Sequence, residues 1–258
     1  QNTHHSDISF HIVKVTTNFQ WKKLYLHKIY LNTMLIVLEG LDGAGKSTQL
    51  KMLREWLSSI GKDVKYLHFP RFEAPVYGDL IAKFLRGDFG SIDQVHPQLV
   101  ALLFAEDRKD AAKEMREWLN EGKVVILDRY VFSNIAFQCS KLKDKSEQEA
   151  LAKWIFDLEF KTFNIPKPDL NIFLDVPINF VDSKLKNSRS GDDRAYLDGK
   201  SDIHEANISF QIKVREIYLQ QCEIHKNFIR IDCGSDSGIM LPATDIFSEI
   251  KREAGKLL

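Results

Sequence analysis

The feature that most constrains the fold of this chain is a glycine-rich loop, EGLDGAGKST, at residues 39–48. Its frame, Gly40 followed after four residues by Gly45-Lys46-Ser47, is typical of a loop that binds phosphate through backbone N–H groups. The apolar run MLIVLEG ends in the loop, and the helical stretch KSTQLKMLREWLSSIG follows it, so a helix N-terminus faces the same anion. We expect a nucleotide phosphate site here rather than a flexible glycine turn. Its expected residues are Gly40, Gly43, Ala44, Gly45, Lys46, Ser47 and Thr48.

Strand-like runs alternate with amphipathic helical stretches from Met34 onward. The runs are MLIVLEG, DVKYLHF, KVVILDRY, DLNIFLDVP and FIRIDC, and helical stretches separate them at about 81–86, 95–120, 146–163, 202–226 and 244–257. This alternation predicts an α/β fold, a doubly wound five-stranded parallel sheet with helices on both faces. Because such sheets bind ligands at the carboxyl ends of their strands, we expect the functional residues to gather at that edge.

The charge balance gives no global attraction to nucleic acid or membrane surfaces, and we expect neither as a partner. The 258 residues include 36 lysines and arginines and 36 aspartates and glutamates, so local basic residues must hold any phosphate ligand. The three cysteines, Cys139, Cys222 and Cys233, form no CxxC pair, which favours reduced thiols in a cytoplasmic protein. No apolar run approaches the length of a membrane span.

Residues 1–33 differ from the rest of the chain. They contain one acidic residue, four lysines and no arginine, and they lack the apolar core and small-residue cleavage site of a secretory signal. We predict an N-terminal extension of unknown role at residues 1–33 and one domain at residues 34–258.

Two charged residues lie together at the end of the run VVILD. Asp128 is a carboxylate of the kind that holds the hydration shell of Mg²⁺, and Arg129 is able to bind a phosphoryl group through two hydrogen bonds. A surface ion pair at a strand end is the alternative interpretation. The phosphate loop elsewhere in the same sheet favours ligand binding.

If the turn after Arg129 is helical, two pairs of residues share helix faces. Ser133 lies four residues before Phe137, and Asn134 lies four residues before Gln138. Because amides both donate and accept hydrogen bonds, the second pair is suited to reading the edge of a base.

Two further groups allow two interpretations each. Phe104 and Arg108 lie four residues apart in a stretch that strongly favours a helix, so their side chains project to the same side. An aromatic ring beside a planar donor suits the binding of a nucleobase. The alternative is a phenylalanine in the core and an arginine in solvent. Arg189 and Arg194 lie in the polar stretch 183–205, which suits a loop that carries an arginine finger or simply a charged surface loop.

Four blocks together resemble the thymidylate kinase family of P-loop nucleoside monophosphate kinases. They are GLDGAGKSTQ, LLFAEDR, LDRYVFSNIAFQ and DIHEANISFQIKVREIYL, in the family's order, and the third is the most specific. The resemblance implies the P-loop nucleotide kinase fold over residues 34–258, with a lid at about 183–203. It also implies transfer of the γ-phosphoryl group of ATP to dTMP with Mg²⁺, in dTTP synthesis. Family members are often homodimers, and the helix at 95–119 is the candidate face.

The resemblance implies roles for individual residues. Asp42 matches the loop acid that contacts the sugar hydroxyl of the acceptor, Phe104 the ring stacked on thymine, and Arg108 the donor to its O4. Arg129 matches the clamp on the acceptor phosphate, and Phe137 the aromatic against the 2′ carbon. The implied acceptor set is Asp42, Arg71, Phe104, Arg108, Arg129, Ser133, Asn134, Phe137 and Gln138, and the implied metal set is Ser47 with Asp128 through water.

Two positions depart from the family pattern. Gly43 stands where some members carry arginine, so the catalytic arginine is expected from the lid, as Arg189 or Arg194. Arg71 lies one place earlier than the corresponding arginine of many members, which affects its implied contact with the acceptor phosphate. The implied catalytic set is Lys46, Asp128, Arg129, Arg189 and Arg194.

The sequence is also compatible with two other functions. One is a P-loop kinase for another deoxynucleotide or a deoxynucleoside, for which Glu73 is a weak candidate base. The other is a regulatory module that binds nucleotide without turnover, although such a module has no need of the complete charge set for phosphoryl transfer.

Overall fold

The computed structural model of the protein describes residues 33–186, 196–198, 202–204 and 208–258. Five strands form one parallel sheet in the order β2-β3-β1-β4-β5. The predicted doubly wound five-stranded parallel sheet is confirmed. The strands are β1 (Met34–Gly40), β2 (Val64–His68), β3 (Val124–Asp128), β4 (Leu170–Asp175) and β5 (Phe228–Asp232).

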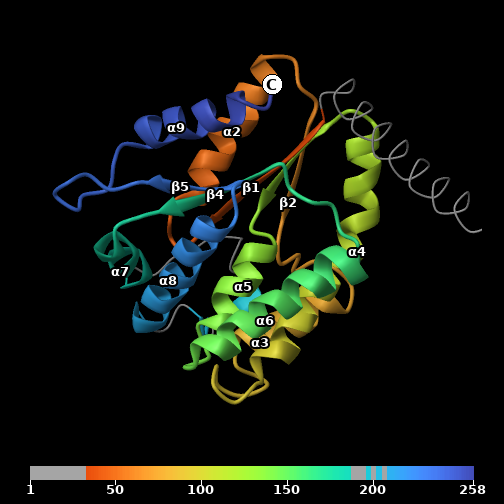
Figure 1. Ribbon diagram of the computed structural model, residues 1–258, viewed down its shortest axis with the longest axis vertical. Helices are drawn as coiled ribbons and strands as arrows, with labels where there is room; N and C mark the ends of the chain where they lie inside the picture. The colour runs from red at the N-terminus through yellow and green to blue at the C-terminus, as the bar shows by residue number, and fades with distance from the viewer. Residues whose placement is uncertain (1–32, 187–195, 199–201, 205–207) are drawn as a thin grey trace, which may run out of the picture.

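Helices cover both faces of the sheet (Figure 1). On one face lie α2 (Lys46–Ser59) and α9 (Ala243–Gly255), which pack against each other. On the other face lie α4 (Pro97–Asn120), α5 (Val131–Cys139) and α8 (Ile208–Ile224). Since both faces of the central strand β1 are covered, every residue of it is buried, which explains its unbroken apolar run.

The remaining helices flank this core. They are α3 (Tyr77–Leu85), α6 (Lys145–Asp157), which continues into a π-helical turn (Leu158–Thr162), and α7 (Ile178–Lys186). The helices predicted at 95–120 and 244–257 lie where expected. The one predicted at 81–86 begins earlier, at Tyr77, and the one predicted from 202 begins at Ile208, with residues 202–204 outside any helix.

The predicted lid at about 183–203 begins within α7, and the lid itself stays a prediction. Ile178, Val181 and Leu185 are spaced to share one face of that helix, and Val181 is fully buried. Apolar contact with the domain therefore extends the helix into the polar stretch. Residues 1–32 lie outside the described residues, so the predicted boundary of the extension stays a prediction.

None of the helices in the described ranges is long and apolar enough to cross a membrane.

Candidate active site

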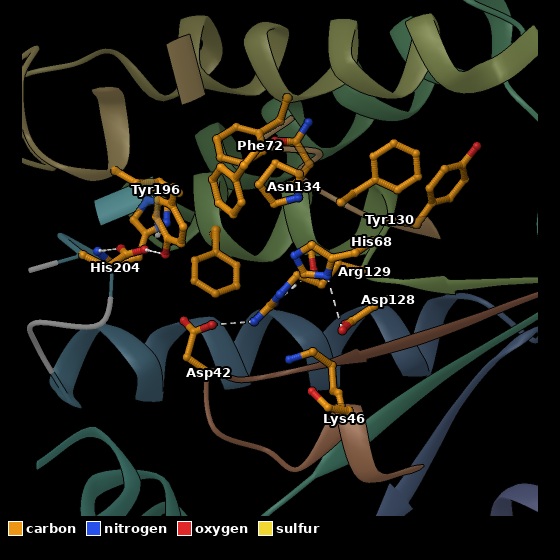
Figure 2. Close-up of a pocket in the computed structure, with 18 of the residues that line it drawn as sticks. Asp42, Lys46, His68, Phe72, Asp128, Arg129, Tyr130, Asn134, Tyr196 and His204 are labelled. Carbon is orange, nitrogen blue, oxygen red and sulfur yellow. Dashed lines mark hydrogen bonds and ion pairs between the residues drawn. The ribbon is translucent and has the colours of Figure 1, made fainter. Parts of the chain in front are cut away.

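A cavity of about 1050 Å³ opens at the carboxyl edge of the sheet, where β1, β2 and β3 end (Figure 2). This is the edge at which doubly wound sheets bind ligands. Its lining includes most of the residues predicted from the sequence: Asp42, Gly43, Ala44, Gly45, Lys46, Ser47, Thr48, Phe104, Arg108, Asp128, Arg129, Ser133, Asn134, Phe137 and Gln138.

The glycine-rich loop forms the floor of this cavity. Gly43 and Gly45 both have φ of 78°, a left-handed conformation that residues with a Cβ rarely adopt. Gly40 is not on the lining; it lies in β1, where an added Cβ would come within 3.2 Å of Ala44 Cβ. Lys46 Nζ donates to Leu41 O at 3.1 Å, and burial lowers the pKa of this lysine to about 8.

Arg129 connects the end of β3 to the loop. Its Nη2 donates to Asp42 Oδ1 at 2.6 Å and its Nη1 to Ser133 Oγ at 3.2 Å (Figure 2). The other oxygen of Asp42 accepts from Gln211 Nε2 at 3.1 Å. Burial opposes the charge of Arg129, but the Asp42 carboxylate holds the pKa of the guanidinium above its usual value. The arginine is therefore a fixed cation in the cavity wall.

Asp128 lies beside the phosphate loop and is almost completely buried. Burial alone would raise its pKa, but the Lys46 ammonium and a hydrogen bond from His68 hold the pKa below its usual value. His68 Nδ1 lies 3.3 Å from Asp128 Oδ2, and the two residues are partners in the β2–β3 register (Figure 2). Asp128 Oδ1 is buried and has no hydrogen-bond partner among the described residues.

A wall of α4 and α5 closes the cavity opposite the loop. Arg108 Nε and Nη2 donate to both oxygens of Glu159, at 2.5 and 2.7 Å, and both residues are buried. Asn134 Nδ2 donates to Ala101 O at 3.0 Å and to Glu159 Oε1 at 3.1 Å. Its Oδ1 is buried without a partner in the described part of the chain. The ring of Phe104 packs edge-on to Phe84 with centroids 6.4 Å apart.

The thymidylate kinase family model matches residues 38–238, most of the chain. The chain belongs to the thymidylate kinase family.

Individual relatives agree with this assignment. A probable thymidylate kinase of Thermococcus kodakarensis is 36% identical over 208 residues, which cover 79% of this chain and 91% of that protein. A thymidylate kinase of Mycobacterium tuberculosis is 38% identical over 143 residues, which cover 55% of this chain and 66% of that protein, just under two thirds of its length. The solved structure of the thymidylate kinase from Candida albicans superposes with a TM-score of 0.64 at 24% identity, covering 87% of this chain and 93% of that one. At that identity the superposition supports the fold alone.

One residue of the family-derived set does not lie on the cavity. Arg71 is absent from the lining, and its contact with the acceptor phosphate stays a prediction. Its Nε donates to Asp107 Oδ1 at 2.9 Å and its Nη2 to Asp110 Oδ2 at 2.6 Å. Two carboxylates of α4 thus hold the guanidinium on that helix. The two lid candidates, Arg189 and Arg194, lie outside the described residues.

The sequence interpretation missed several residues on the lining. Phe72 and Tyr196 stack with centroids 3.7 Å apart and an interplanar angle of 7° (Figure 2). His204 lies against Phe137 at 5.1 Å between centroids. Burial lowers the pKa of His204 well below its ordinary value, which favours the neutral ring. Of these residues, His68 had a usable signal in the sequence, because it lies next to last in the predicted strand DVKYLHF, near the ligand-binding edge.

Proposed function

We propose that this thymidylate kinase family member transfers the γ-phosphoryl group of ATP to dTMP, giving dTDP and ADP. The observation that carries the choice of acceptor base is the orientation of Asn134. Both of its contacts, Ala101 O and Glu159 Oε1, are acceptors, so they take the amide hydrogens. What remains for a ligand is the buried acceptor Oδ1.

Arg108 supplies the donor beside this acceptor. Its contacts with Glu159 use Nε and Nη2, so Nη1 is the nitrogen assigned to a base carbonyl. Thymine and uracil present a carbonyl O4 next to an N3–H donor. The carbonyl matches the donor Arg108 Nη1, and the N3–H matches the acceptor Asn134 Oδ1. Cytosine presents the reverse pattern and would leave Asn134 Oδ1 buried and unpaired, a mismatch that sites of this kind reject strongly.

The charges at the other end of the cavity suit phosphoryl transfer. The acceptor phosphate is already a nucleophile, so the protein contributes positioning and neutralisation of charge rather than a base. Arg129 would hold the acceptor phosphate, Asp42 the sugar hydroxyl, and Lys46 the outer phosphates of ATP. Arg189 and Arg194 stay predicted sources of a further cation from the lid.

The residues near Lys46 also fit Mg²⁺. Ser47 is exposed at the loop, and Asp128 has one buried oxygen without a partner in the described residues. No group of three histidine, cysteine or acidic residues that could hold a metal occurs in the described ranges, so water and substrate phosphates must complete the coordination, as is usual for this ion. When bound, Mg²⁺ would neutralise charge on the phosphates.

The proposal is tested by a coupled ADP-release assay with ATP and Mg²⁺, offering dTMP, dUMP, dCMP, dGMP and thymidine separately. We expect the fastest turnover with dTMP, and slow turnover with dCMP. Faster turnover with thymidine or dCMP would identify a different kinase. Protein that binds ATP but forms no ADP with any acceptor would be a regulatory nucleotide-binding module.

A matched pair of variants tests the assignment of the base. Asn134→Ala should raise the KM for dTMP about tenfold or more, as expected when a buried hydrogen bond to the ligand is lost. Asn227→Ala removes an exposed amide that donates to Pro168 O and should leave the KM unchanged. Equal effects of the two substitutions on the KM would mean that Asn134 does not contact the base.

Two further predictions remain part of this proposal. A cytoplasmic location is supported by Cys139, Cys222 and Cys233, all of which have free thiols. A homodimer through the helix at 95–119 is supported by the exposed side chains of Leu99 and Leu102 on α4. Sedimentation equilibrium would test the dimer.

A further inference from the structure

We infer that Glu39 is the positioning residue for Arg129, and that it sets how tightly the protein binds the phosphate of the acceptor nucleotide. This inference rests on the proposed function, in which Arg129 binds that phosphate.

Glu39 is a fully buried carboxylate inside the sheet, next to last in β1. Its Oε1 accepts from Tyr130 N at 2.9 Å and from Ser133 N at 3.1 Å. Its Oε2 accepts from Tyr218 Oη at 3.0 Å and makes a short hydrogen bond with Ser133 Oγ. One side chain of β1 therefore ties the beginning of α5 to the central strand and to α8.

These contacts surround a backbone conformation that needs support. Arg129 has φ of 65°, in the left-handed region that residues with a Cβ avoid. Such a conformation persists only where the neighbouring structure determines it. Arg129 N donates to Leu38 O at 2.9 Å, and the next amide, Tyr130 N, donates to Glu39. Consecutive residues of β1 thus hold the two peptide groups on either side of Arg129.

A second connection reaches the guanidinium itself. Arg129 Nη1 donates to Ser133 Oγ at 3.2 Å, and the same hydroxyl is bonded to Glu39. Because Arg129 offers only donors, Ser133 Oγ accepts from it and gives its own hydrogen to the carboxylate. The accepting oxygen of Glu39 therefore orients Ser133 to receive Arg129. Burial raises the pKa of Glu39, and the charge of Arg129 opposes that rise.

Glu39→Gln separates this role from simple core packing. The amide oxygen of Gln would still accept from both backbone N–H groups, but its NH₂ would donate to Ser133 Oγ and reverse the hydrogen bond that orients this hydroxyl. The shape of the core stays nearly constant while the support for the guanidinium is lost.

The experiment compares the dissociation constants of dTMP and thymidine by calorimetry, without ATP. The two ligands differ only in the 5′-phosphate, so their ratio reports the phosphate contact. We expect Glu39→Gln to weaken dTMP about tenfold, typical for loss of a well-aligned charge-assisted contact, while thymidine binds as before. In an Arg129→Ala background the same substitution should cause no further loss, because the two residues act through one contact.

Several outcomes would overturn the inference. Equal weakening of dTMP and thymidine would mean that Glu39 only stabilises the core, and additive losses in the double variant would mean that it does not act through Arg129. If Glu39→Gln does not fold, Tyr218→Phe removes a hydroxyl that is hydrogen-bonded to both this carboxylate and Ser133 Oγ. An unchanged ratio in that protein would overturn the inference. The control Glu55→Gln, on the exposed side of α2, should change neither constant. Wild-type protein that binds dTMP no tighter than thymidine would instead overturn the proposed function.

Discussion

Arg129 and Asp42, 87 residues apart in sequence, form an ion pair of 2.6 Å between the end of β3 and the phosphate loop. Both side chains lie on the cavity, and Gln211 of α8 holds the second oxygen of Asp42. The cation assigned to the acceptor phosphate and the acid assigned to its sugar thus hold each other in place before ligand binds. Such pre-organisation reduces the conformational entropy that is lost when the ligand binds.

Asp42→Asn should break this arrangement. We expect kcat/KM for dTMP to fall about tenfold or more, because Arg129 and the sugar hydroxyl both lose a charged partner. Steady-state kinetics with each substrate varied in turn would show a change confined to dTMP. Asp245→Asn, an exposed change on α9, is the control. A larger effect on the KM for ATP would contradict the assignment.

Lys46→Ala should keep the fold and lose phosphoryl transfer by about a hundredfold or more, as is typical for one contact to the transition state. The fold should survive because burial already disfavours this ammonium, as its pKa of about 8 indicates. Circular dichroism and single-turnover kinetics would measure both effects. Lys51→Ala removes an exposed lysine of the same helix and should be neutral. Near-normal turnover of Lys46→Ala would contradict the assignment of this loop to the phosphates of ATP.

Phe104→Ala should raise the KM for dTMP more than the KM for ATP, because an aromatic face for the base is lost. Phe89→Ala removes a half-exposed ring that is not on the lining and serves as the control. If both Michaelis constants rise equally in the Phe104 variant, the ring is a core residue that packs on Phe84.

Glu159→Gln should destabilise the protein by about 3–5 kcal/mol, because buried Arg108 would lose its ion-pair partner. Urea denaturation would show a lower midpoint with an unchanged slope. Asp157→Asn, two residues earlier, breaks contacts with Lys153 and Lys161 that solvent already screens, and should shift the midpoint little. Similar midpoints for the two variants would show that the Arg108 pair contributes little.

Lys141 should make stability depend on pH. Burial lowers its pKa from 10.5 to about 7, and Asp93 and Asp202 only partly oppose that shift. Between these values the unfolded chain binds a proton that the folded chain lacks, so the free energy of unfolding rises with pH. Relative to Lys141→Met, the wild-type protein should therefore gain stability from pH 7 to pH 10.5. A constant difference in the free energy of unfolding between the two proteins over this pH range would contradict the prediction.

The amino-acid sequence alone predicted the sheet, the phosphate loop and half of the residues that line the cavity. These depend on local patterns. A buried strand such as MLIVLEG is continuous in sequence, and the left-handed turns of the loop require glycine at positions that are read directly. Asp128 and Arg129 were found in the same way, because the residue that follows a buried strand must lie at its carboxyl edge.

The partners that hold these residues became visible in the folded protein alone. Arg71 was predicted on the cavity, but Asp107 and Asp110 bind it on α4, 36 and 39 residues along the chain. Glu159 pairs with Arg108 across 51 residues, and Glu39 reaches Tyr130 across 91. The unfavourable free energy of burying a charge is offset by an opposite charge or a hydrogen-bond donor that packing places nearby. No local pattern records that choice, because periodicity specifies which face of an element is buried and not which side chains meet there.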